Sequence, residues 1–69
     1  MQEFNKIKAT RVGAGITQEQ MAEALGMAKT TYIFKENGNK DWKLTEMNKF
    51  AEIISKATGQ KCSAQDIFF

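Results

Sequence analysis

The sequence predicts an all-α domain, for three reasons: apolar residues recur at helical spacing, caps and glycines mark helix boundaries, and strand patterns are nearly absent. Sixty-nine residues can bury one small core but not two, so we expect a single domain over residues 1–69. A core of this size usually leaves only about 3–5 kcal/mol of net stability unless a disulfide, a metal or a partner subunit supplements it.

The first predicted helix covers Gln2–Val12 and ends at Gly13. One of its faces carries, at the spacing i, i+3, i+7, the residues Phe4, Ile7 and Arg11. A second helix begins after Thr17, because a threonine N-cap followed three residues later by Gln20 has the spacing of a capping box. We expect its buried stripe to consist of Met21, Ala22 and Leu25.

The second helix should end in a sharp turn at Gly26, because only glycine adopts a left-handed backbone at little cost. A third helix is then predicted from about Ala28 to Asn37, closed in the same way by Gly38. Ala28 stands where a serine or threonine N-cap is usual, which should cost the helix about 1 kcal/mol of stability.

A fourth, strongly apolar helix is predicted to begin near Thr45. Its core-facing residues should be Met47, Phe50, Ala51 and Ile54. Ser63 and Asp66 repeat the N-cap signature, which predicts a last helical turn from Ala64 to Ile67 or Phe68. Of the three C-terminal residues Ile67, Phe68 and Phe69, we expect Ile67 and one phenylalanine to close the core, and the other phenylalanine is left as a candidate dimer contact. We also expect Trp42 to anchor the preceding loop against the core.

Composition excludes several classes of function. The only cysteine is Cys62, which we expect in the core, so no intrachain disulfide forms, and with no histidine a zinc site of thiolate and imidazole ligands has no ligand set. No stretch is long and apolar enough for a membrane helix, and the polar N-terminus does not resemble an export signal, so we expect a cytoplasmic protein. Without histidine or depth for a desolvated carboxylate, we expect neither an enzyme nor a cofactor. The net charge of +2 is too small to prove an anionic partner by itself.

The spacing of a helix-turn-helix is found at Gln18, Ala22, Gly26 and Tyr32. The side chain at each position has a steric role in that motif. Ala22 is small where two helices would cross closely, Gly26 makes the turn, and Tyr32 reaches back from the next helix to fix the angle between them. Gln18 opens the first helix of the pair. Such an angle lets one helix enter a major groove while the other crosses the DNA backbone.

The run ITQEQMAEALGM at Ile16–Met27 resembles the helix-turn-helix of the lambda-repressor-like family, of the Cro and C-repressor type. The ending Lys35-Glu36-Asn37-Gly38 resembles that family's Glu-x-Gly helix ending, and the likeness extends from Phe4 to about Phe68. It implies a compact five-helix bundle that binds double-stranded operator DNA, usually as a homodimer.

The resemblance also implies an ion pair between Arg11 and Glu36, which would fix the third helix. Two positions depart from the family, whose members usually carry an aliphatic residue at the site of Tyr32 and often another apolar residue at the site of Lys35. Here we expect the Tyr32 ring to be buried with its hydroxyl bonded to a partner. We expect the Lys35 stem to lie along the core with its ammonium at the surface.

If Tyr32 and Glu36 face inward, helix geometry turns the opposite face of the third helix toward a major groove. The residues that we expect to contact bases there are Lys29, Thr30, Thr31, Ile33 and Phe34. The residues that we expect to contact phosphates on either side are Gln18, Asn37, Lys40 and Lys43.

The leading hypothesis is a sequence-specific transcription regulator, most simply a phage or prophage repressor that occupies an operator as a dimer. The alternative is an antirepressor or interaction module on the same fold, which would bind a partner regulator protein through Ile33 and Phe34, two large apolar residues on an exposed face. A third possibility is an antitoxin or a restriction-modification control protein, which would still bind DNA.

Overall fold

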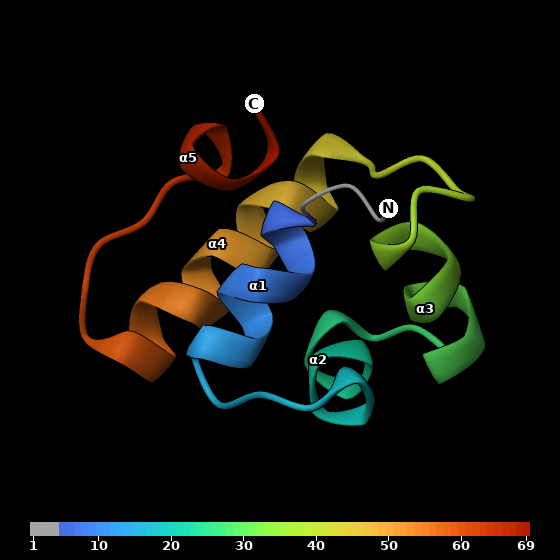
Figure 1. Ribbon diagram of the computed structural model, residues 1–69, viewed down its shortest axis with the longest axis horizontal. Helices are drawn as coiled ribbons and strands as arrows, with labels where there is room; N and C mark the ends of the chain where they lie inside the picture. The colour runs from blue at the N-terminus through green and yellow to red at the C-terminus, as the bar shows by residue number, and fades with distance from the viewer. Residues whose placement is uncertain (1–4) are drawn as a thin grey trace.

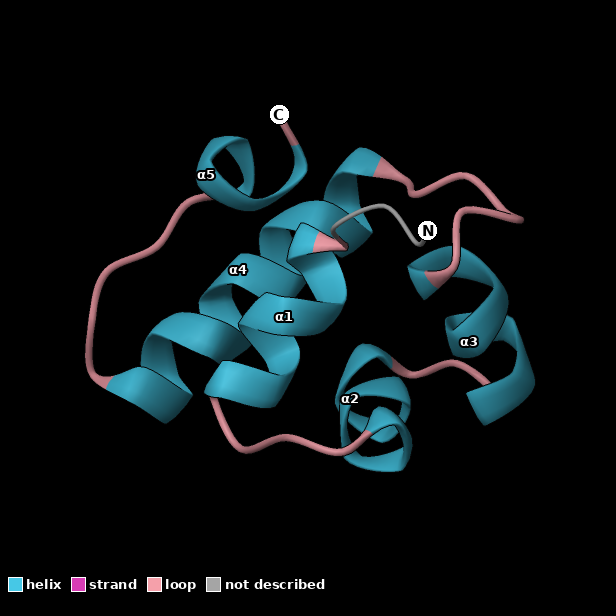
Figure 2. Cartoon of the chain, viewed as in Figure 1, coloured by secondary structure: helices cyan, strands magenta, loops and turns pink. Residues whose placement is uncertain are grey.

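The computed structural model describes residues 5–69, which form five helices and no strand, so the all-α prediction is confirmed (Figure 2). The helices are α1 (Lys6–Gly13), α2 (Gln18–Leu25), α3 (Lys29–Glu36), α4 (Leu44–Thr58) and α5 (Ala64–Phe68). No helix in the described range is long and apolar enough to cross a membrane.

Helix α1 begins at Lys6 and not at Gln2, because Asn5 has an extended backbone and serves as the N-cap. The Asn5 side chain accepts a hydrogen bond from the Lys8 backbone N–H at 3.0 Å. The predicted start at Gln2 is therefore wrong, since an extended Asn5 interrupts any helix that runs through it. Phe4, which was expected on the inner face, lies outside the described residues.

The local signals of α2 form as the sequence predicts. Thr17 and Gln20 make both bonds of the capping box. The Gln20 backbone N–H donates to the Thr17 hydroxyl at 3.0 Å, and the Thr17 backbone N–H donates to the Gln20 side-chain oxygen at 2.9 Å. Gly26 ends the helix with φ of +73°, in the left-handed region. Helix α3 follows with no side-chain cap at Ala28, as expected.

The core lies where α4, the longest helix, meets the other elements. Helix α2 packs against α3 and α4, and α5 packs against α1 and α4 (Figure 1). The largest side chains with no solvent exposure are Met21, Tyr32 and Phe50, from α2, α3 and α4 respectively. Leu25 was expected in the buried stripe but is only partly buried against this cluster.

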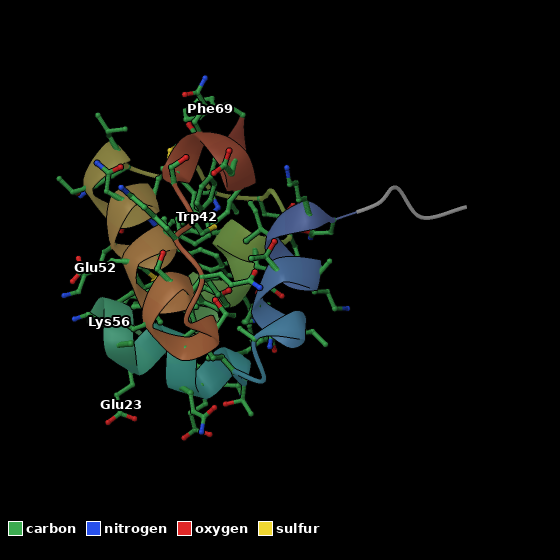
Figure 3. All side chains as sticks on the ribbon, turned by 90° about the vertical axis from the view of Figure 1, so that its left-hand side faces the viewer. Glu23, Trp42, Glu52, Lys56 and Phe69 are labelled. Carbon is green, nitrogen blue, oxygen red and sulfur yellow. The ribbon has the colours of Figure 1, made fainter. Side chains whose placement is uncertain are left out.

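The Trp42 indole anchors the loop that leads from α3 to α4, as the sequence predicts. Its ring makes edge contacts with Tyr32, Phe50 and Phe68, with centroid distances of 4.9–6.0 Å. Ile67 is buried and Phe68 packs on the core, whereas Phe69 is 78% exposed and points outward (Figure 3). Phe68 is therefore the phenylalanine that closes the core.

Candidate nucleic-acid interface

Helix α3 has one buried and one exposed face. Tyr32, Lys35 and Glu36 are buried and attach the helix to the rest of the domain. Lys29 and Thr30, at the N-terminal end of the helix, are exposed. Helix α3 lies at the edge of the molecule (Figure 1).

The exposed face is less apolar than the sequence suggests. Phe34 is 45% exposed, whereas Ile33, which was expected on the exposed face with it, is half-buried. Thr31, between the two faces, is also half-buried. Phe34 is therefore the most exposed large apolar side chain of α3.

The Glu36 carboxylate joins three helices. Arg11 of α1 donates to it from Nε at 2.7 Å and from Nη2 at 3.2 Å, in a two-bond ion pair. Gln18 of α2 donates its amide at 3.2 Å, and the Tyr32 hydroxyl donates from within α3. The Asn5 side chain adds a bond of 2.8 Å to the Glu36 backbone carbonyl. These contacts fix the C-terminal end of α3 in position and in rotation about its own axis.

The network is fully paired, which is what a buried ion pair needs to be tolerated. Within residues 5–69 every buried side-chain nitrogen and oxygen has a hydrogen-bond partner. Burial by itself would raise the pKa of Glu36, but hydrogen bonds from Arg11, Tyr32 and Gln18 outweigh burial and hold that pKa below its usual value of 4.5. Burial, and then the adjacent carboxylate, raise the pKa of Tyr32 above its usual 10.0.

These two shifts predict how stability depends on pH. A lowered pKa in the folded state means that Glu36 contributes stability above pH 4.5, and this stability is lost as the pH falls through the folded-state pKa. A raised pKa means that Tyr32 contributes below pH 10.0 and that its contribution is lost as the pH rises beyond that value. We expect the free energy of unfolding, measured by urea denaturation across pH, to decline below pH 4.5 and above pH 10.0. A stability that increases below pH 4.5 would contradict this.

Lys35 departs from the expectation that its ammonium reaches the surface. Its side chain is only 7% exposed, and Nζ lies 2.6 Å from Oε1 of Glu46 in the first turn of α4. Its backbone carbonyl accepts a bond of 3.0 Å from the Trp42 indole N–H. The side chain is tolerated in this position because α4 supplies a carboxylate that pairs with its ammonium, a partner that the sequence around Lys35 does not reveal.

The four residues expected to contact phosphates lie on two elements. Asn37, Lys40 and Lys43 are exposed in the loop between α3 and α4, close in sequence to the end of α3. Gln18 opens α2, where unpaired backbone N–H groups and the helix dipole favour an anion. Its side-chain amide, however, is bonded to Glu36, which sequence reasoning missed because the partners are 18 residues apart.

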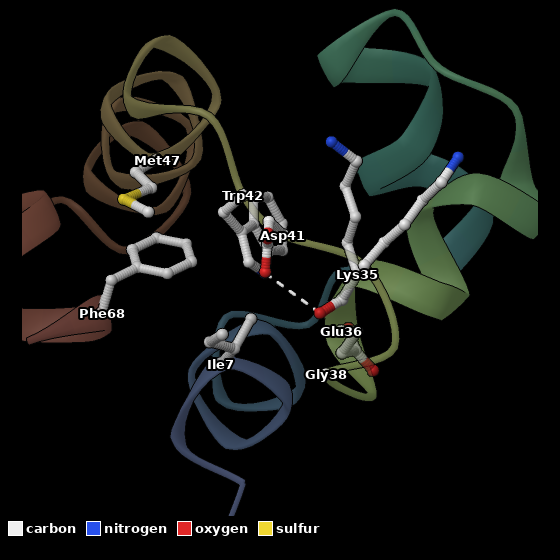
Figure 4. Close-up of a pocket in the computed structure, with 9 residues that line it drawn as sticks. Ile7, Lys35, Glu36, Gly38, Asp41, Trp42, Met47 and Phe68 are labelled. Atoms are coloured by element: carbon white, nitrogen blue, oxygen red, sulfur yellow. Dashed lines mark hydrogen bonds between the residues drawn. The ribbon is translucent and has the colours of Figure 1, made fainter.

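A shallow, open pocket of about 510 Å³ lies beside this loop (Figure 4). Its apolar wall consists of Ile7, Trp42, Met47 and Phe68. The described residues contain no group of three side chains that could hold a metal ion.

Comparison with known proteins identifies the fold that carries this interface. The chain matches the helix-turn-helix family over residues 7–58, a range that begins one residue into α1, ends with α4 and therefore includes both helices of the motif, α2 and α3. Comparisons with curated proteins and with solved structures gave no match. The chain therefore belongs to the XRE-like helix-turn-helix family, whose members of the lambda-repressor and Cro type are DNA-binding transcription regulators.

Proposed function

We propose that the protein is a sequence-specific repressor of phage or prophage type, which binds operator DNA as a homodimer with α3 in the major groove. The observation that supports this most is the way α3 is held. Its C-terminal end is fixed by the Glu36 network, whereas Lys29 and Thr30 at its N-terminal end are exposed. In helix-turn-helix proteins the N-terminal residues of the second helix are the ones that contact base edges.

The side chains on this face offer a definite combination of base contacts. Lys29 can donate to the O6 and N7 acceptors of guanine, and Thr30 or Thr31 can bond a base edge or touch a thymine methyl. Phe34 has no hydrogen bond to offer, so its role would be apolar contact with a thymine methyl. Ile33, half-buried, would contribute the part of its side chain that remains exposed. The proposed operator half-site thus contains both a guanine and thymines.

Phosphate contacts on both sides of α3 would set the register in which bases are read. Lys40, Lys43 and Asn37 would contact phosphates from the loop that follows the helix. Gln18 would do so through its backbone at the start of α2, because its side-chain amide is already bonded to Glu36. A second copy, related by a two-fold axis, would read a second half-site about one helical turn away.

The test is a titration of the protein against promoter fragments from its own genetic neighbourhood, at several salt concentrations between 50 and 200 mM. A repressor with about six to ten phosphate contacts per dimer should lose roughly 10³–10⁵-fold in affinity over this range and should prefer particular fragments. Two chains should bind each preferred site. Binding that is absent or insensitive to salt would contradict DNA recognition, and equal binding to all fragments would contradict sequence specificity.

A further inference from the structure

Hydrogen bonds join three segments at one junction: the C-terminal end of α3, the loop that follows it, and the first turn of α4. The Lys35 ammonium on α3 and the Lys43 backbone N–H both donate to Oε1 of Glu46, at 2.6 and 2.9 Å. The Trp42 indole donates to the Lys35 carbonyl at 3.0 Å, a bond that is drawn in Figure 4. A single carboxylate and a single lysine therefore connect the end of α3, the end of the following loop and the first turn of α4.

This junction differs in kind from an ordinary surface ion pair. The Lys35 side chain is 7% exposed and that of Glu46 is 20% exposed. Burial alone would raise the pKa of Glu46, yet hydrogen bonds from Lys35 and from the Lys43 backbone lower it. By contrast, Lys56 and Glu52 form a surface ion pair on α4, in which Nζ lies 3.3 Å from Oε1 (Figure 3). Their side chains are 78% and 65% exposed.

The junction closes a loop of seven residues, 37–43, at both of its ends. Lys35 lies just before the loop, and Lys43 is its last residue. Between them, Trp42 is held against the core by its aromatic contacts. The loop carries the exposed Asn37, Lys40 and Lys43, so the pair between Lys35 and Glu46 determines where these side chains lie relative to α3.

We propose that the Lys35–Glu46 pair is a positioning device for DNA binding. It holds the 37–43 loop in register with α3, so that phosphate contacts from the loop and base contacts from the helix are made together. This inference rests on the proposed function, because it assumes that the loop contacts phosphates. Lys35 itself is a positioning residue: its ammonium is committed to Glu46 and does not contact DNA.

The first experiment compares Lys35→Met with Lys56→Met, because both variants remove one positive charge. Methionine keeps the length of the buried stem but has no ammonium to give to Glu46. We expect Lys35→Met to reduce the slope of log affinity against log salt by about 0.9 for each loop–phosphate contact that is lost. Lys56→Met should leave the slope unchanged. An unchanged slope in a folded Lys35→Met protein would overturn the proposal.

A second pair of variants separates positioning from direct contact. Glu46→Gln keeps Lys35 in the chain but removes the charge that holds it, and we expect the same loss of slope. A steeper slope in Glu46→Gln would show that the freed lysine contacts phosphate itself, which would overturn the proposal. The double variant Lys35→Met, Glu46→Gln leaves no buried charge unpaired and should fold. Its slope of log affinity against log salt therefore tests the proposal if either single variant does not fold. A wild-type slope in the double variant would also overturn the proposal.

Amide hydrogen exchange of the free protein distinguishes failure of this inference from failure of the proposed function. Loss of the junction should accelerate exchange in the 37–43 loop of Lys35→Met but not of Lys56→Met. If exchange is faster in Lys35→Met but the wild-type protein binds no DNA, the repressor function is contradicted. The conclusion that the Lys35–Glu46 pair holds the loop would still stand. Unchanged exchange would contradict the clamp, whatever the protein binds.

Discussion

Replacing Glu36 with alanine is expected to destabilise the domain by about 3–5 kcal/mol, because it removes one partner of a buried ion pair. The Arg11 guanidinium would lose both of its bonds to the carboxylate and keep the one from Nη1 to the Ile16 carbonyl, at 2.6 Å. Gln18 and Tyr32 would lose their shared acceptor as well. A domain of this size has only about 3–5 kcal/mol in total, so most molecules should unfold at 25 °C.

Glu52→Ala is the matched control, since Glu52 also pairs with a basic residue but is exposed. Its free energy of unfolding, measured by urea denaturation, should change by no more than about 1 kcal/mol. The double variant Arg11→Met, Glu36→Leu should recover part of the loss, because it leaves no stranded charge. If Glu36→Ala were as stable as Glu52→Ala, the network would not be what holds α3 in place.

Replacing Lys29 with alanine is expected to weaken binding to the preferred operator by about 1–3 kcal/mol for each half-site, the discrimination that a good base contact provides. In a titration at fixed salt this is a loss of roughly 5–150-fold in affinity for each half-site, and the proposed dimer reads two of them. Binding to random DNA should weaken much less, because Lys29 is expected to read a base edge and not a phosphate. The ratio of the two affinities is therefore the measurement that matters.

Lys56→Ala serves as the control for Lys29→Ala, because Lys56 is also an exposed lysine but lies on α4, outside both α3 and the loop that follows it. It should leave the ratio of operator to random affinity unchanged. An equal loss on both DNAs for Lys29→Ala would place Lys29 on a phosphate and leave base reading to Thr30 and Phe34.

The sequence alone determined the features of this protein that depend on short stretches of chain. A capping box needs residues three apart, and the left-handed turn needs one glycine, so both were correctly predicted at Thr17 and Gly26. The apolar face of α4 follows helical periodicity, and Phe50, Ala51 and Ile54 are buried as expected. The family resemblance added the Arg11 and Glu36 pair, which these short-range patterns do not contain.

Only the tertiary structure decided which polar side chains become buried together. Gln18 reaches Glu36 across 18 residues, and Lys35 reaches Glu46 across 11, from one helix to another. Neither pairing has a periodic signature, because it depends on where two separate helices come to rest. The partial burial of Ile33 is likewise not given by its position in the helix. The local sequence therefore specifies helix α3, and contacts between distant residues determine how that helix is positioned in the fold.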